Sequence, residues 1–262
     1  MSDVDDITGT VLAAVMPRTV VMTAVPASNP NIFGTTPTPN LARRLAAQAA
    51  AALIGCAVDD VVMRSLCRHC GGAHGSLFVD QPADSGVTVS LSRAPGLEIA
   101  VASHLGPVGI DVESVGRMLR APVDSVALHP LEIDALVELD PGARDRARTV
   151  QWTRKEALLK STGFGLRIAP DSIALSGVGE AALAAPVRIL EAPDLLWDEL
   201  TEGGFTPEFT DLGDWAPEHP EPALSPAVSH PDTSNSAELQ VGADVVGSLC
   251  VLHARSSRGA VL

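Results

Sequence analysis

Basic side chains, aromatic rings and long apolar runs are all scarce in this 262-residue chain. Asp and Glu outnumber Lys and Arg by 32 to 18, and the formal net charge is −14. A field of that sign argues against a nucleic-acid-binding protein, which needs positive charge to meet phosphates. No run of about 18 apolar residues occurs, so the sequence predicts no membrane-spanning helix. The 3% aromatic content and the absence of tyrosine say little about chemistry.

The N-terminus lacks the features of a secretory signal, because residues 1–6 are acidic where such a signal is basic. A cytoplasmic protein is therefore expected. The length permits one large domain or two domains of about 130 residues. A hydrophobic content of 46% is enough for a sizeable core.

The apolar pattern changes along the chain and predicts a mixture of helices and strands. We expect helices over 41–54, 131–139 and 143–161, and strands over 20–25, 77–79, 87–91, 97–103, 108–113, 173–175, 187–189 and 245–252. Gly106 and Pro107 are expected to form a hinge between two halves. Residues 203–236 are rich in prolines, acids and small side chains, which predicts a long flexible excursion.

Two acidic side chains alternate with apolar ones in the segment Gly-Ile-Asp-Val-Glu at 109–113. In a strand, Ile110 and Val112 point toward a core, and Asp111 and Glu113 point together the other way. Two like charges on one face favour a cation, and carboxylate oxygens suit Mg²⁺. An edge strand with a solvated acidic face is the alternative.

A helix is predicted over the segment Val-Gln-Trp-Thr-Arg-Lys-Glu-Ala-Leu-Leu-Lys at 150–160. Trp152, Glu156 and Leu159 fall on one stripe, which places a carboxylate between two large apolar side chains. Lys160 follows Glu156 by four residues, and Lys155 precedes it directly. A surface Glu-Lys pair is the alternative. Gly163 just beyond the helix suits a left-handed cap.

Three of the four cysteines lie at 56, 67 and 70, and the cluster Cys67-Arg68-His69-Cys70 continues to His74. Cys67, Cys70 and His74 have the spacing of a zinc knuckle. A structural zinc site needs four ligands in closed geometry, and no second Cys-x-x-Cys or His-x-His pair completes the set. A redox Cys-x-x-Cys motif prefers the N-terminus of a helix after a strand. Zinc binding and redox chemistry remain the less favoured alternatives.

The paired segments at 109–113 and 152–160, together with Thr-Gly-Phe-Gly-Leu at 162–166, resemble the signature of the 4'-phosphopantetheinyl transferases. The resemblance is to the two-lobed branch that serves polyketide and nonribosomal peptide synthesis in secondary metabolism, and it covers roughly residues 40–180. It implies an α+β fold, a pseudo-dimer of two similar α/β lobes with coenzyme A in the cleft between them. The lobes would be 1–106, with coenzyme A contacts, and 107–262, with the metal site and the catalytic helix.

The resemblance also implies the reaction. A Mg-dependent enzyme moves 4'-phosphopantetheine from coenzyme A to a serine of an apo acyl or peptidyl carrier protein, as a holo-[acyl-carrier-protein] synthase does. Adenosine 3',5'-bisphosphate is the second product. The metal ligands would be Asp111, Glu113 and Glu156, and Mn²⁺ is an alternative to Mg²⁺. Glu156 would also accept the serine proton, and Lys160, assisted by Lys155, would neutralise charge on the phosphate.

Further coenzyme A contacts are expected on the N-terminal side of the metal segment. In the resemblance, His74 and the glycines around it shape the nucleotide side of the pocket, and Arg43 and Arg44 hold the 3'-phosphate. Ser92 matches a phosphate-binding serine of the family, whereas Arg93 replaces a histidine and can bind phosphate but not act as a base. Ser76 stands where a basic residue is common, so one cationic contact is missing.

The expected partner is an apo carrier protein or a carrier domain of a synthase, together with coenzyme A, with no nucleic acid and no membrane, and the enzyme is expected to be a monomer. Carrier proteins are usually acidic, so docking on an acidic chain needs local positive or apolar surface. Residues 114–120, which include Arg117 and Arg120, offer both, although an ordinary amphipathic loop is equally consistent with this segment. The alternative function is a non-catalytic relative that binds coenzyme A or a carrier protein. Another Mg²⁺ phosphotransferase lacks support because no Walker loop occurs.

Overall fold

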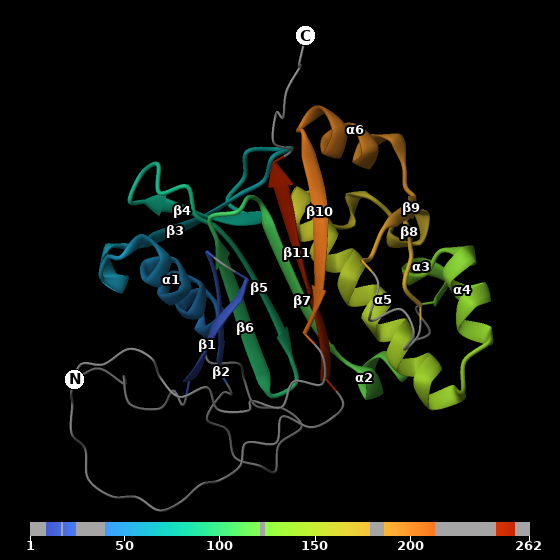
Figure 1. The fold of residues 1–262 in the computed structure, drawn as a ribbon. Coiled ribbons are helices and arrows are strands. Elements are labelled where there is room, and N and C mark those ends of the chain that lie inside the picture. Colours follow the sequence, from blue (N-terminus) through green and yellow to red (C-terminus); the bar gives the residue numbers. More distant parts are fainter. Residues whose placement is uncertain are drawn as a thin grey trace, which may run out of the picture.

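The structure is a computed structural model, and it describes residues 9–16, 18–24, 40–120, 124–178, 186–212 and 245–254. It combines helices with three antiparallel sheets, which agrees with the expected α+β class (Figure 1). No helix within the described ranges combines the length and the apolar sequence that crossing a membrane requires.

The N-terminal half is a six-stranded sheet covered by one helix. The strand order is β1-β2-β6-β5-β4-β3. The bounds are β1 Gly9–Met16, β2 Thr19–Ala24, β3 Val62–Leu66, β4 Ser76–Gln81, β5 Thr88–Ala94 and β6 Leu97–Ser103. Helix α1, Leu41–Ile54, lies across β2, β5 and β6, and the 3-10 helix η1, Val58–Asp60, follows it. The alanines on one side of α1 are buried, which lets the helix lie close to the sheet.

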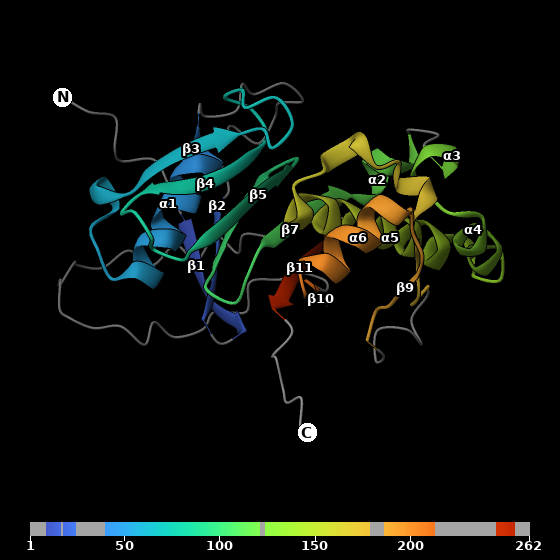
Figure 2. The ribbon, with the colours of Figure 1, turned by 90° about the horizontal axis from the view of Figure 1, so that it is seen from above.

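The C-terminal half is a three-stranded sheet, β10-β11-β7, with the long helix α5 across one face (Figures 1 and 2). The strands are β7 Val108–Ser114, β10 Phe205–Asp211 and β11 Val245–Ala254, and a separate pair is formed by β8 Ala174–Leu175 and β9 Ile189–Glu191. The helices are α2 Val115–Leu119, α3 Asp124–Ala127, α4 Pro130–Val137, α5 Pro141–Thr162, η2 Gly165–Arg167, η3 Pro170–Ser172 and α6 Asp194–Glu202.

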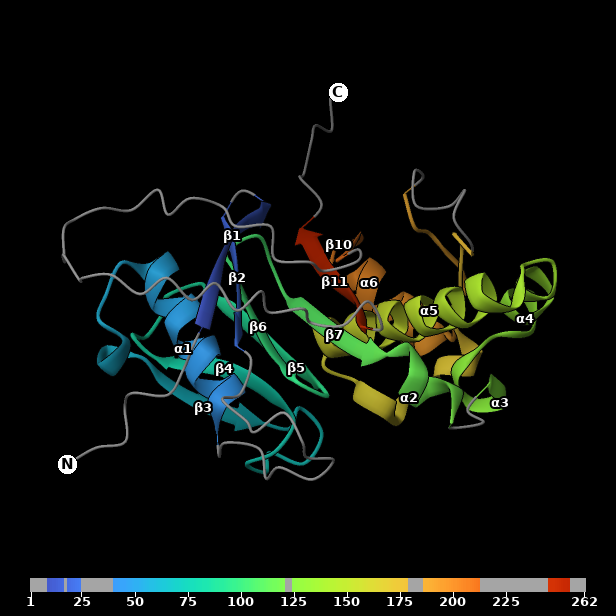
Figure 3. The same cartoon turned by 90° about the horizontal axis from the view of Figure 1, so that it is seen from below.

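The two sheets meet where β5 runs beside β7 (Figure 3). Apolar side chains of both sheets form one buried cluster there, which includes Ile99, Val101, Ile110, Val112 and Leu249. Strand β7 is an edge of its own sheet, but its backbone does not face solvent. The backbone N–H of Ile110 donates to Ser90 Oγ at 3.2 Å, so β5 side chains cover that edge. The predicted core role of Ile110 and Val112 is confirmed.

Most predicted elements are present, and the differences have physical reasons. The helix predicted over 41–54 has those bounds, and α5 includes 143–161. Strands β1 and β3 and helix α6 were not predicted. The flexible excursion predicted over 203–236 is wrong for Phe205–Asp211, which forms β10 and pairs with β11, a strand far away in sequence. The remainder, from 213 onward, lies outside the described residues.

Candidate functional site

The site begins where helix α5 crosses strand β7 at Gly109. A Cβ atom built on Gly109 would lie 1.9 Å from the carbonyl oxygen of Ala157 and 2.7 Å from the backbone nitrogen of Ser161. Only glycine allows the helix backbone this close to the strand. The close approach places the face of α5 that carries Glu156 and Lys160 directly over the face of β7 that carries Asp111.

Asp111 is a buried carboxylate with two contacts on one oxygen. The residue is 6% exposed, and Oδ1 accepts hydrogen bonds from Ser92 Oγ at 2.8 Å and from Lys160 Nζ at 2.7 Å. Lys160 Nζ also donates to the carbonyl oxygen of Ile110 at 3.0 Å. These contacts fix the carboxylate from both halves of the molecule. They also contradict two of the alternatives, a solvated acidic strand and a surface pair between Glu156 and Lys160.

Glu156 and Glu113 lie near Asp111, and the pKa of each is raised. Burial raises the pKa of Glu156, and the charge of Asp111 raises it further, whereas Lys160 lowers it. Burial also raises the pKa of Glu113, again with Asp111 adding to the effect. Within the described part of the chain, Asp111 Oδ2 and Glu156 Oε1 are buried and have no hydrogen-bond partner. Buried oxygens of this kind are costly unless something neutralises them.

The three carboxylates therefore fit a hard divalent cation in their chemistry. Asp111, Glu113 and Glu156 would hold it, and Mg²⁺ or Mn²⁺ suits all-oxygen donors. The donor atoms are not drawn into one tight group, however. In the ranges that the structure describes, three potential metal-binding atoms lie within 4.8 Å of one another only at Cys67, Cys70 and His74, which offer sulfur and nitrogen.

A cavity of about 860 Å³ lies beside the carboxylates, between the two halves of the molecule. Its wall includes the side chains Arg43, Arg68, Arg93, Lys160 and Arg167, with His69 and His74, and no Asp or Glu in the described part of the chain lines it. In a chain of net charge −14, such a wall is a strong local exception. Concentrated positive charge in a concave site favours an anion that carries several phosphates. Lys160 belongs to both features, since it lines the cavity and contacts Asp111.

The predicted nucleotide contacts divide between the cavity and other places. Arg43, His74 and Arg93 line the cavity, and Arg44, the next residue on α1, does not. Arg93 also lies 3.9 Å from Glu98. Ser92 was expected to bind a phosphate of coenzyme A. In the structure its hydroxyl donates a hydrogen bond to Asp111.

Lys155 is not brought into this group. It is fully buried on another side of α5, and its Nζ donates to the carbonyl oxygen of Ala127 at 2.8 Å and to Glu132. Glu132 in turn accepts from the backbone N–H groups of His129 and Leu175, both at 2.9 Å. Lys155 and Glu132 thus form a buried ion pair with satisfied hydrogen bonds, which fixes α5 against α4 and β8.

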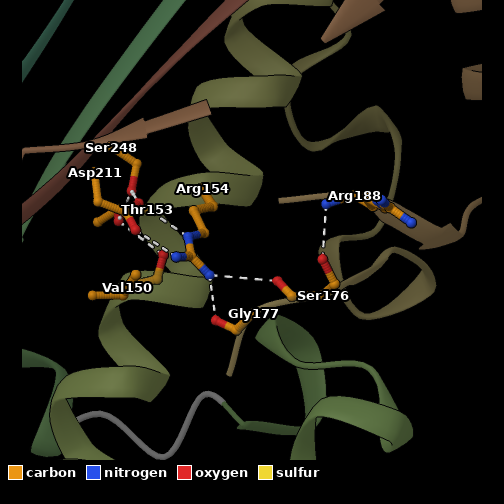
Figure 4. Close-up of polar contacts among 8 residues, drawn as sticks. All are labelled: Val150, Thr153, Arg154, Ser176, Gly177, Arg188, Asp211 and Ser248. Atoms are coloured by element: carbon orange, nitrogen blue, oxygen red, sulfur yellow. Dashed lines mark hydrogen bonds and ion pairs between the residues drawn. The ribbon is translucent and has the colours of Figure 1, made fainter. Parts of the chain in front are cut away.

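Two neighbours of Lys155 also anchor the helix (Figure 4). Arg154 is 1% exposed, forms an ion pair with Asp211 on β10 and donates to the carbonyl oxygen of Gly177 at 2.5 Å. Thr153 Oγ1 lies 2.9 Å from Ser248 Oγ on β11. The residues of the motif Trp-Thr-Arg-Lys-Glu therefore have different roles on different faces of α5. Thr153, Arg154 and Lys155 hold the helix, and Glu156 faces β7.

Sequence reasoning missed Arg68 and Arg167 as cavity residues. Arg68 Nη1 donates to the carbonyl oxygen of Thr162 at 2.6 Å and forms an ion pair with Glu199 on α6 at 2.8 Å. Arg167 follows Gly163, whose left-handed cap (φ 75°) is confirmed and turns the chain back toward the cavity. The sequence does place these two arginines beside segments that were predicted to form the site. That position alone could not identify them as cavity residues, because basic residues are common on protein surfaces.

Comparison with known families supports this location of the site. Residues 107–191 match the family model of the 4'-phosphopantetheinyl transferase superfamily. The matched range includes β7 and α5, the two elements that carry the carboxylates. Members of that superfamily transfer phosphopantetheine from coenzyme A and typically use a divalent metal. No curated protein matches the chain.

Proposed function

Because residues 107–191 match the family model of the 4'-phosphopantetheinyl transferase superfamily, we propose that this chain converts an apo acyl or peptidyl carrier protein to its holo form. The donor is coenzyme A, and adenosine 3',5'-bisphosphate leaves. The observation that carries the proposal is the juxtaposition at Lys160 of a buried carboxylate group and a cavity walled by cationic side chains. One feature suits a metal and a reacting phosphorus, and the other suits the phosphates of the nucleotide.

The residues of the chain have separable roles in the proposed reaction. The carrier serine oxygen attacks the phosphorus next to pantetheine, a new P–O bond forms, and the P–O bond to adenosine 3',5'-bisphosphate breaks. Glu156, whose pKa burial raises, accepts the serine proton. Lys160 neutralises charge on the transferring phosphate, while Ser92 fixes the carboxylate of Asp111. Bound Mg²⁺ would supply further charge stabilisation.

Coenzyme A is proposed to lie in the cavity with its phosphates near Arg43, Arg93 and Arg167. The cavity lies between two sheet-and-helix halves, whose main sheets have six and three strands among the described residues. We propose that these halves, divided near Gly106, are the two lobes of a pseudo-dimeric enzyme. Of the expected contacts, Lys155 is replaced in this proposal by Arg167, because Lys155 does not line the cavity and its amine is held by Glu132.

Carrier docking is proposed at helix α2, directly after the carboxylate strand. Arg117 and Arg120 are exposed there, and Leu119 exposes about half of its surface, 49%. Cations beside an exposed apolar side chain complement an acidic carrier. Secondary-metabolism carriers, a monomeric enzyme and a cytoplasmic location are further parts of the proposal.

The test weighs apo carrier proteins by intact mass spectrometry after incubation with the protein, Mg²⁺ and coenzyme A. A mass gain of one phosphopantetheine is expected, and it should disappear with EDTA and with Glu156→Gln. Glu202→Gln, which changes an exposed carboxylate on α6, is the matched control and should retain activity. Arg93→Gln and Arg167→Gln should raise the KM for coenzyme A by about tenfold each, since a hydrogen bond to a charged group is lost. Arg64→Gln, outside the cavity, should not.

Full turnover by Glu156→Gln would contradict the assignment of the base and ligand. Coenzyme A binding without transfer to any carrier of a broad panel would instead favour the non-catalytic relative. Absence of both binding and transfer would mean that the cavity serves another anion.

A further inference from the structure

The turn between β3 and β4 gathers three metal-binding side chains outside the carboxylate site. Cys67, Cys70 and His74 each offer one donor atom, and these atoms lie within 4.8 Å of one another. Cys70 Sγ and His74 Nε2 are 3.1 Å apart. The carboxylates of Asp111 and Glu156 belong to other elements and offer only oxygen, so the turn is a chemically different cluster.

The backbone of the turn is folded to keep the two sulfurs on the same side. The N–H of Gly71 donates to Cys67 O, and the N–H of Cys67 donates to Gly72 O, both at 2.9 Å. The N–H of Gly72 donates to Cys70 Sγ at 3.4 Å, which fixes the position of this sulfur. Gly75 has a positive φ of 92°, and a Cβ there would lie 2.9 Å from Leu66 O. The main chain therefore builds the loop that brings the three donors together.

Two sulfurs and one imidazole nitrogen are soft to borderline donors and suit Zn²⁺. Tetrahedral zinc with Zn–S near 2.3 Å and Zn–N near 2.0 Å needs donors roughly 3.5–3.8 Å apart. Cys70 Sγ and His74 Nε2 lie 3.1 Å apart and the other pairs lie within 4.8 Å, so the separations of the group bracket this range. No fourth His, Cys, Asp or Glu donor joins the group among the described residues, which leaves one coordination position open. The absence of a second Cys-x-x-Cys argued against a closed structural site, but an open three-ligand site does not need one.

We propose that Cys67, Cys70 and His74 bind one Zn²⁺ ion in the wall of the cavity, and that the ion fixes the turn carrying Arg68 and His69. Cys67 and His74 line the cavity, so a bound ion lies at its surface. Metal binding at this place does not depend on the proposed transferase activity.

The turn is also a connection between the two halves of the molecule. Arg68 reaches from it to Thr162 O at the end of α5 and to Glu199 on α6. A Cβ on Gly163 would lie 3.1 Å from both Arg68 Cδ and Ser76 Oγ, so the turn lies directly against the cap of α5. An ion that fixes the turn would therefore also fix the orientation of α5 and its catalytic face.

The test uses the full chain without an affinity tag, reduced and stripped of metal, and titrates it with Co²⁺ as a spectroscopic probe for Zn²⁺. We expect one equivalent to give thiolate-to-cobalt absorption in the near ultraviolet, which Zn²⁺ then removes. Cys70→Ser and His74→Ala should weaken binding by more than about tenfold. Cys56→Ser, which removes a half-buried cysteine outside the group, is the matched control. Glu156→Gln should keep the band, because oxygen ligands produce no thiolate absorption.

A second measurement needs no variant and covers a loss of fold in any of them. Zn²⁺ should protect Cys67 and Cys70 from iodoacetamide, while Cys56 stays equally reactive, as peptide masses would show. No thiolate band, a band unchanged in Cys70→Ser, or equal alkylation with and without Zn²⁺ would each overturn the proposal. A disulfide between Cys67 and Cys70 that forms equally fast with Zn²⁺ present would do the same. The transferase assay is separate, so its failure would leave the metal result interpretable.

Discussion

Replacement of Gly109 by alanine tests whether the contact between β7 and α5 sets the site. The new Cβ would lie 1.9 Å from Ala157 O, where an ordinary contact begins at about 3.4 Å, so the helix must retreat by about 1.5 Å. The obstructing atoms belong to a helix backbone and cannot rotate away. Overpacking of this kind costs about 1–3 kcal/mol or more. A displacement of about 1 Å at reacting groups costs about 100-fold in rate.

Urea unfolding followed by tryptophan fluorescence should show a midpoint lower by about 1 M for Gly109→Ala. Carrier modification followed by intact mass should slow by about 100-fold or more. Gly142→Ala is the control, since Gly142 also lies on α5 and a Cβ there meets nothing within 4 Å. That change should be neutral or stabilising by up to about 1 kcal/mol. Equal stability and equal activity of the two variants would refute the argument that this crossing positions Asp111 and Glu156.

Two further predictions concern buried groups behind the site. Glu132→Gln leaves the amine of Lys155 buried without its counter-charge and should destabilise the fold by about 3–5 kcal/mol. Asp80→Asn, in the partly exposed ion pair with Arg64, should cost less than about 1 kcal/mol. Similar urea midpoints for the two variants would contradict this. Burial raises the pKa of the Cys250 thiol to about 12 from 9.0, so its stabilising contribution is complete below pH 9 and is lost as the pH rises toward 12. Between pH 8 and 10.5, wild type should therefore lose about 2 kcal/mol more stability than Cys250→Ala, and parallel pH profiles of the two would contradict it.

Local pattern was sufficient for the elements that carry the site. The alternation at 109–113 predicted that Ile110 and Val112 enter the core, and both are buried. The helical spacing predicted α5, and Gly163 was expected at its left-handed cap. These features depend on backbone periodicity and on the freedom of glycine at positive φ, which are properties of a short segment. Strand β10 was not predicted because it depends on pairing with a distant segment: its partner β11 follows only after residues 213–244.

The sequence by itself determined which residue types are available at this site and which face of its strand or helix each occupies. Only the tertiary structure decided their partners. Lys155 and Lys160 are both lysines of one helix, yet one is buried against Glu132 and the other reaches Asp111 and the cavity. Ser92 contacts Asp111, and Arg68 reaches α5 and α6, across long distances in sequence. Helical and strand periods fix direction within an element, whereas an ion pair or a cavity wall depends on how elements distant in sequence pack together.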